Sequence, residues 1–134
     1  MKKLAIVAAA CLLVPGCAGN TKVTAQDLAS NTYVLQSING TSFTSRERTP
    51  EITFQENMRV SGQTCNRFMG QGQLKDGTLQ VAEMASTMML CADPQLNTME
   101  RDLAAMLRAG AAISLDGKNL TLSRDGITYV YLRK

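Results

Sequence analysis

One stretch decides the fold class: Ile113-Ser114-Leu115-Asp116-Gly117-Lys118-Asn119-Leu120-Thr121-Leu122-Ser123-Arg124-Asp125-Gly126-Ile127-Thr128-Tyr129-Val130-Tyr131-Leu132. Apolar and polar residues alternate in three short runs, and an Asp-Gly pair separates each run from the next. Asp-Gly is a strong signal for a tight turn between antiparallel strands. The stretch therefore predicts an antiparallel meander.

The part of the chain before this stretch also reads mainly as short strands. Asn39-Gly40, Glu56-Asn57 and Asp76-Gly77 mark turns between runs that are rich in strand-forming residues. The expected strands are Tyr33–Ile38, Glu51–Phe54, Met58–Ser61, Thr64–Leu74 and Thr78–Val81. With the meander, these runs predict an antiparallel sheet of about seven or eight strands.

One segment has helical rather than strand periodicity. Asp93 followed by Pro94 is typical of a helix start, and Gly110 stands where a helix commonly ends. Between them an apolar stripe repeats at helical spacing and comprises Leu96, Met99, Leu103, Met106 and Leu107. An amphipathic helix among strands must bury such a stripe on a sheet or in one end of a barrel. We therefore expect an α+β fold with one packed amphipathic helix.

The N-terminus has the features of an export signal. Lys2 and Lys3 precede an apolar run over residues 4–14, which is too short to span a bilayer. Gly16-Cys17 follows, and the pattern resembles the lipobox of bacterial lipoproteins, in which the cysteine is lipidated and becomes the mature N-terminus. The alternative is an ordinary signal peptide with an incidental cysteine.

This interpretation divides the chain into three parts. Residues 1–16 are the lipoprotein signal peptide, residues 17–27 the lipidated N-terminus and tether, and residues 28–134 the folded domain. Thr24 and Asp27 within the tether have the spacing of a helix capping box. Ala18 and Gly19 follow Cys17, without the aspartate that favours inner-membrane retention. We therefore expect a protein anchored in the outer membrane by its lipid and facing the periplasm.

Of the four cysteines, only Cys65 and Cys91 would remain as thiols in the folded domain, because Cys11 leaves with the signal peptide and Cys17 is lipidated. In an exported protein such a pair is most simply a disulfide. A redox-active pair is the alternative, but the C-x-x-C spacing typical of such pairs is missing.

Composition argues against several function classes. The chain has no histidine, its carboxylates are scattered, and no phosphate-binding glycine-rich loop follows a strand. We expect no enzyme, no catalytic residue, no cofactor and no metal site. Removing Lys2 and Lys3 nearly balances the 14 basic residues against the 11 acidic ones, so nucleic acid is not an expected partner.

Methionine is abundant, with eight in the chain. Soft thioethers bind Cu(I), so Met88 and Met89 with Cys91 form one conceivable copper site. The favoured interpretation is that most methionines fill the core, where this flexible side chain suits irregular spaces.

The segment around Cys65 carries a family resemblance. Gly62, Cys65, Asn66, Phe68 and Gly70 reproduce a Gly…Cys-Asn-x-aromatic-x-Gly pattern. A Thr-x-Met-x-Cys element follows at residues 87–91, and the chain resembles the META domain of the HslJ type over about residues 28–133. The resemblance implies a small conical β-barrel or strongly curved antiparallel sheet with one helix packed against it.

The resemblance also suggests a function. It implies a bacterial envelope lipoprotein linked to heat shock and novobiocin resistance, with no established catalytic residue. We expect a monomer that acts in stress tolerance or outer-membrane integrity by binding an envelope protein or an apolar ligand. The candidate binding residues are Asn66, Arg67, Phe68, Leu96 and Met99. The alternatives are a pilotin-like protein that binds a secretion component and, less favoured, a Cu(I)-binding protein. The competing interpretation of Asn66 is a buried amide that forms hydrogen bonds to the backbone of a turn. For Arg67 it is an exposed strand position without a binding role.

Overall fold

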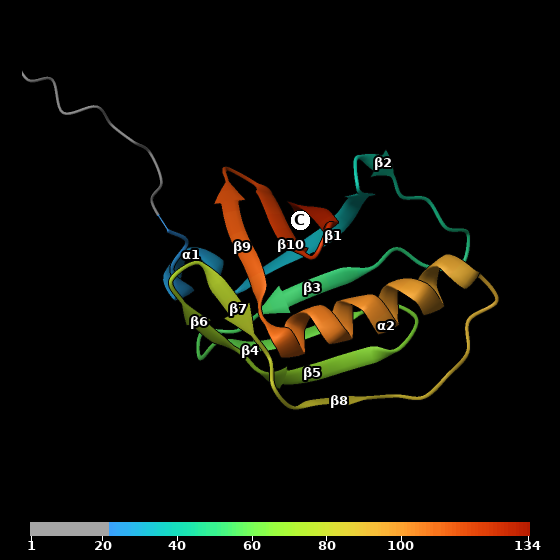
Figure 1. Ribbon diagram of the computed structural model, residues 1–134, viewed down its shortest axis with the longest axis horizontal. Coiled ribbons are helices and arrows are strands. Elements are labelled where there is room, and N and C mark those ends of the chain that lie inside the picture. Colours follow the sequence, from blue (N-terminus) through green and yellow to red (C-terminus); the bar gives the residue numbers. More distant parts are fainter. Residues whose placement is uncertain (1–21) are drawn as a thin grey trace, which may run out of the picture.

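An antiparallel sheet of eleven strands and two helices make up the computed structural model, which describes residues 22–134 (Figure 1). The expected signal peptide and the lipidation site Cys17 lie outside the described residues. The helices are α1 (Ala25–Leu28) and α2 (Pro94–Ala109). The strands are β1 (Asn31–Ile38), β2 (Thr41–Ser42), β3 (Glu51–Phe54), β4 (Arg59–Gln63), β5 (Arg67–Gln71), β6 (Gln73–Lys75), β7 (Thr78–Gln80), β8 (Met84–Ser86), β9 (Ala111–Asp116), β10 (Asn119–Arg124) and β11 (Ile127–Arg133).

The strands form one curled sheet in the order β6-β7-β9-β10-β11-β1-β3-β4-β5-β8, with β2 paired to β1. Strands β6 and β8 stand at the two ends of this order, so the sheet is curved and open. Helix α2 lies across one side of the sheet, in front of β3, β4 and β5 in Figure 1. The predicted α+β class, a curved antiparallel sheet with a packed amphipathic helix, is confirmed.

The number of strands is larger than predicted. Segment 64–74 was expected to be one strand, but the chain turns at Thr64–Asn66 and divides again at Gly72 into β5 and β6. Gly72 donates its N–H to the Met58 carbonyl oxygen at 2.9 Å, and a Cβ at this position would come within 2.6 Å of the same oxygen. Close backbone approach therefore requires glycine at this bend.

The meander of β9, β10 and β11 has the predicted form. Asp125 and Gly126 both have positive φ, 50° and 81°, as the tight turn between β10 and β11 requires. The inward side chains of these strands are buried with Tyr33 of β1, and they include Leu120, Leu122, Tyr129 and Tyr131. Because these large side chains fill the inside of the sheet, the interior is a packed core and not an open ligand cavity.

Helix α2 begins and ends where the sequence predicts. The Asp93 side chain accepts a hydrogen bond from the Gln95 N–H at 3.0 Å, Pro94 occupies the first turn, and Gly110 follows the last turn with φ of 109°. All five residues of the predicted apolar stripe are buried. Among residues 22–134 no helix is long and apolar enough to cross a membrane.

The packed domain starts upstream of residue 28. The capping box of α1 is present, since Thr24 N–H donates to Asp27 at 2.9 Å and Asp27 N–H donates to the Thr24 hydroxyl at 3.3 Å. The hydrogen bonds with Thr24 lower the pKa of the Asp27 carboxyl. Val23 before the box and Leu28 at its end are both in the core. The packed domain therefore includes Val23, five residues before the predicted domain start at residue 28.

Candidate functional site: an apolar loop held by a disulfide and a buried amide

Three consecutive large apolar side chains are exposed between β8 and α2. The exposed fraction is 96% for Met88, 55% for Met89 and 87% for Leu90. We call the segment from Thr87 to Ala92 the apolar loop. Its position at the end of the molecule next to the start of α2 is visible at the right of Figure 1.

A disulfide fixes one end of the apolar loop. Cys65 and Cys91 are bonded, with their Cα atoms 5.7 Å apart, and both side chains are buried. The bond joins the turn between β4 and β5 to the residue that closes the loop, as expected from the sequence. Since Cys91 is in this bond, the proposed copper site lacks its thiolate and retains only two exposed thioethers.

The Asn66 side-chain amide fixes the other end of the loop. Its Oδ1 accepts from the Met89 N–H at 2.6 Å and from the Thr87 hydroxyl at 2.9 Å. Its Nδ2 donates to the Met89 carbonyl oxygen at 3.0 Å and to Glu100 Oε2 at 2.8 Å. These four bonds use both donors and both lone pairs of the amide. Asn66 is 3% exposed, so its amide supports the loop and is not free to bind a ligand.

Glu100 on α2 completes the polar cluster. Its Oε1 accepts from the Asn66 backbone N–H at 2.7 Å and from the Thr64 hydroxyl at 3.1 Å. Hydrogen bonds to an ionised carboxylate are stronger than bonds between neutral groups. Glu100 therefore joins α2 to the turn that carries Cys65 and Asn66.

Two further side chains hold the C-terminal end of the apolar loop. The Asn97 amide accepts from the Cys91 N–H at 3.0 Å and donates to the Cys91 carbonyl oxygen at 2.9 Å. The Glu47 carboxylate accepts from the Asp93 N–H at 3.0 Å. A hydrogen bond from Ser45, followed by the bond from the Gln95 backbone, lowers the pKa of the Asp93 carboxyl at the helix start. The loop is thus anchored at both ends while its apolar tip is exposed.

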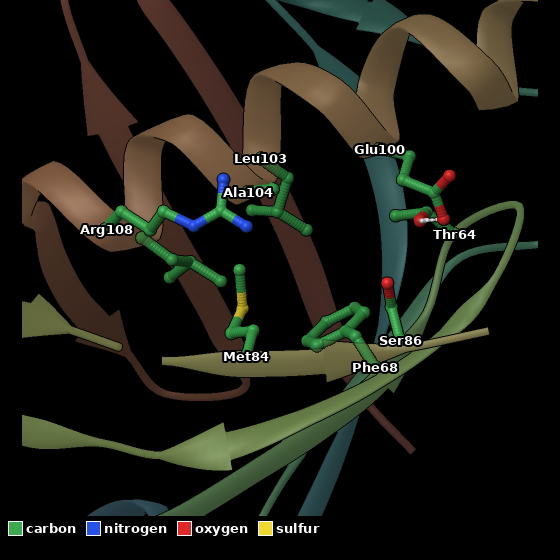
Figure 2. A pocket seen from close by; sticks show the side chains of 9 residues that line it. Thr64, Phe68, Met84, Ser86, Glu100, Leu103, Ala104 and Arg108 are labelled. Atoms are coloured by element: carbon green, nitrogen blue, oxygen red, sulfur yellow. Dashed lines mark hydrogen bonds between the residues drawn. The ribbon is translucent and has the colours of Figure 1, made fainter. Parts of the chain in front are cut away.

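A shallow apolar groove lies beside the loop, between α2 and β8 (Figure 2). Its apolar lining comprises Phe68, Met84, Leu103, Ala104 and Leu107. Glu100 and Thr64 close one end, and Arg108 extends over the other end near Met84. The enclosed space is about 40 Å³, enough for very few waters and too small for a lipid chain.

The candidate binding residues do not form one groove. Phe68 lines the groove beside β8, whereas Met99 lies on the other flank of α2 beside Tyr129. Leu96 is fully buried in the core, because the whole helical stripe faces the sheet. Arg67 is an exposed strand residue whose backbone N–H bonds the Thr87 hydroxyl at 3.2 Å. The structure therefore brings Asn66, Arg67 and Phe68 to the loop side and leaves Leu96 and Met99 as core residues.

The exposed tip of the apolar loop and the role of Glu100 are not predicted from the sequence. The sequence connects Met88 and Met89 with a copper site and Met89 with the family element, but it does not predict that these residues and Leu90 form an exposed surface. A signal was present, because three consecutive apolar residues fit neither strand alternation nor the helical stripe. Glu100 follows Leu96 by four residues and precedes Leu103 by three, which places it at the margin of the buried stripe.

Comparisons with known proteins identify the family. The META domain model matches residues 26–134. The chain belongs to the META domain family. It is 43% identical over 133 residues to the heat shock protein HslJ of Escherichia coli strain K12, covering 98% of this chain and 95% of that protein. The resemblance expected from the Cys-Asn and Thr-Met-Cys elements is therefore confirmed.

Two solved structures are similar in fold to this chain. One solution NMR structure has a TM-score of 0.76 and 42% identity, covering 82% of this chain and 94% of that one. A second, of a protein from Burkholderia xenovorans, has a TM-score of 0.64 and 25% identity, covering 82% and 86%.

Proposed function

We propose that this META domain protein is a non-enzymatic lipoprotein of the bacterial envelope that binds a partner protein through its apolar loop. Cys17 would carry the lipid, and the domain would face the periplasm from the outer membrane as a monomer. Its role would be stress tolerance or outer-membrane integrity. The heat-shock name of the Escherichia coli relative and the novobiocin link implied by the family resemblance support this role.

The exposure of Met88, Met89 and Leu90 on an anchored loop is the observation that carries the proposal. A run of exposed apolar residues is unfavourable in water and commonly marks an interaction site. Methionine adapts its shape to a partner surface at low cost. The disulfide and the Asn66 amide order the loop before any partner arrives, which lowers the entropy cost of binding.

Photo-crosslinking in intact cells tests partner binding. A photoreactive residue replaces Met88 in the full-length protein, and a second variant carries it at exposed Lys118 in the turn between β9 and β10. We expect a discrete adduct from position 88 that position 118 does not give. A secretion component in that adduct would favour the pilotin-like alternative, and equal adducts from both positions would contradict docking by the loop.

Function is tested by complementation of a deletion strain under heat and novobiocin stress. We expect Met88→Ser/Leu90→Ser to lose protection, while Leu132→Ser, which changes an exposed apolar residue on β11, retains it. Full protection by the loop double variant would contradict the proposal.

The anchor is tested separately by Cys17→Ser. We expect the wild-type protein in the membrane fraction and the variant in the soluble periplasmic fraction. A variant that stays membrane-bound would contradict anchoring through Cys17.

A further inference from the structure

Strand β8 ends the sheet, and among residues 22–134 no strand pairs with its outer edge. In the β5–β8 ladder Phe68 is opposite Ser86, Met69 opposite Ala85, and Gly70 opposite Met84. The Thr87 N–H bonds the Arg67 carbonyl oxygen at 3.0 Å. Because hydrogen-bonded and non-bonded pairs alternate in an antiparallel ladder, the N–H and C=O of Met84 and Ser86 point outward.

The side chain of Asn66 lengthens this edge beyond the sheet. Its Oδ1 and Nδ2 bond the N–H and C=O of Met89, as the backbone of a paired strand would. The backbone N–H and C=O groups of Ala85, Thr87 and Met89 thus point toward β5 and Asn66. Those of the alternate residues, Met84, Ser86 and Met88, point away from the sheet. Within residues 22–134 no hydrogen bond is made by the N–H of Met88. The outcome is an extended edge of six residues with three outward backbone positions.

Strand β8 is short, at three residues, but its edge lacks the lysine and proline residues that commonly block strand addition. Such edges are commonly protected by lysine, proline or a covering element. Segment 82–90 contains neither residue, Glu83 is its single charged residue, and the side chains from Ala85 to Leu90 are exposed. A polypeptide strand is therefore the ligand whose hydrogen-bonding groups match this edge.

The groove beside β8 adds side-chain selectivity. Met84 and Ser86 line it, together with Phe68 and residues of α2 (Figure 2). An added strand places every second side chain on this face, where the part-buried Met84 and Ala104 offer apolar contact. Arg108 lies at the end of the groove, and no carboxylate among residues 22–134 forms a salt bridge with it. Its charge would complement an acidic group on the incoming segment.

We propose that the edge from Met84 to Met89 binds an extended segment of the partner protein, which adds to the sheet as a further strand. The segment has alternating apolar side chains toward α2 and an acidic group near Arg108. Its main chain bonds Met84, Ser86 and Met88, and its flank contacts the apolar loop. This inference rests on the proposed function, because it names how the partner docks.

Substitutions at Ser86 test strand addition in the position-88 crosslinking experiment. Ser86→Pro removes the outward N–H and places a ring where the added strand would lie, without removing a bond to β5. Ser86→Ala keeps the N–H and is the matched control. We expect Ser86→Ala to retain the adduct and Ser86→Pro to lose about tenfold or more of it, since a lost hydrogen bond and a steric clash combine.

The outcomes separate the two proposals. If Ser86→Pro keeps the full adduct, strand addition is overturned while partner binding by the loop stands. If position 88 gives no adduct in any variant, the proposed function fails and strand addition fails with it. Where Ser86→Pro does not fold, an ester in place of the Ala85–Ser86 peptide bond removes the same N–H without the ring. Loss of the adduct with the ester then supports strand addition, and retention overturns it.

Discussion

The meander of β9, β10 and β11 and the region of β5, β8 and the apolar loop are stabilised in different ways. In the meander, consecutive strands pair through two-residue turns, and the inward side chains supply the core. In the loop region, a disulfide and a buried amide join residues that are more than twenty positions apart in the chain. Links of this kind keep exposed apolar residues ordered, which burial cannot do, because those residues are not buried.

Removal of the disulfide has the largest expected effect on this comparison. The double variant Cys65→Ala/Cys91→Ala loses the restriction that a 26-residue separation places on the unfolded chain, about 3.5 kcal/mol on the chain-entropy model. Urea unfolding measures the decrease in the free energy of unfolding. Hydrogen exchange shows whether protection falls first at the apolar loop, as we expect, or first in β9–β11, which would contradict the division of the molecule.

Replacement of the buried amide is next in size. Asn66→Asp keeps the shape but places a carboxylate beside Glu100 and removes the donor that bonds both Glu100 and Met89. We expect a loss of about 2–3 kcal/mol at neutral pH from repulsion and unpaired groups. The deficit should shrink in acid, because protonation of the introduced carboxyl restores a donor and removes the repulsion.

The matched control is Asn119→Asp in the meander, where the asparagine is exposed. Its expected effect is within about 0.5 kcal/mol, as for most surface changes. Equal losses in the two variants, measured by urea unfolding at pH 7, would show that the added charge and not the Asn66 network causes the effect.

Features that depend on neighbouring residues can be predicted from the sequence, whereas features that depend on contacts between distant residues cannot. Asp125-Gly126 and the stripe of α2 depend on residues close together in the chain, so both are predicted correctly. The bond from Asn66 to Glu100 spans 34 positions, and no local pattern indicates it. The same limit explains why segment 64–74 is wrong as a single strand, because the turn at Thr64–Asn66 is stabilised by distant partners. The family resemblance identifies Cys65 and Asn66 but not the surface they support.

The pH dependence of unfolding under alkaline conditions tests how far the buried tyrosines of the meander and of β1 stabilise the domain. Burial, followed by the nearby Asp102 carboxylate, raises the pKa of Tyr129 to about 12, and burial also raises the pKa of Tyr33 and Tyr131. The unfolded chain loses these protons near pH 10, whereas the folded chain retains them, so stability falls as the pH rises above about 10. For Tyr129 the expected slope is about 1.4 kcal/mol per pH unit up to about pH 12.

Tyr129→Phe provides the comparison for this slope. Between pH 10 and 12 the free energy of unfolding of the variant should decrease less steeply with pH than that of the wild-type protein, by that amount per pH unit. Urea unfolding at each pH measures both slopes. Tyrosinate absorbance in the wild-type protein should rise together with unfolding. An unchanged slope in Tyr129→Phe would show that this hydroxyl already ionises in the folded state.

The smallest effect is expected where the apolar surface is most conspicuous. Met88→Ser/Leu90→Ser removes two side chains that are 96% and 87% exposed, so the free energy of unfolding should change by less than about 0.5 kcal/mol. Leu122→Ala, by contrast, empties part of the meander core, and we expect it to lose about 2–5 kcal/mol.

This contrast separates binding from stability. For this test the photoreactive residue replaces Met89, and position 118 again serves as the control. If the loop double variant keeps its stability but loses the adduct, then the tip acts in binding and not in folding. A loss of more than about 1 kcal/mol in urea unfolding would contradict that division, because it would mean that Met88 or Leu90 packs against the domain in solution. The anchoring bonds of Asn66 and the disulfide would then serve a buried contact, and the exposed edge of β8 would be left without its adjoining apolar surface.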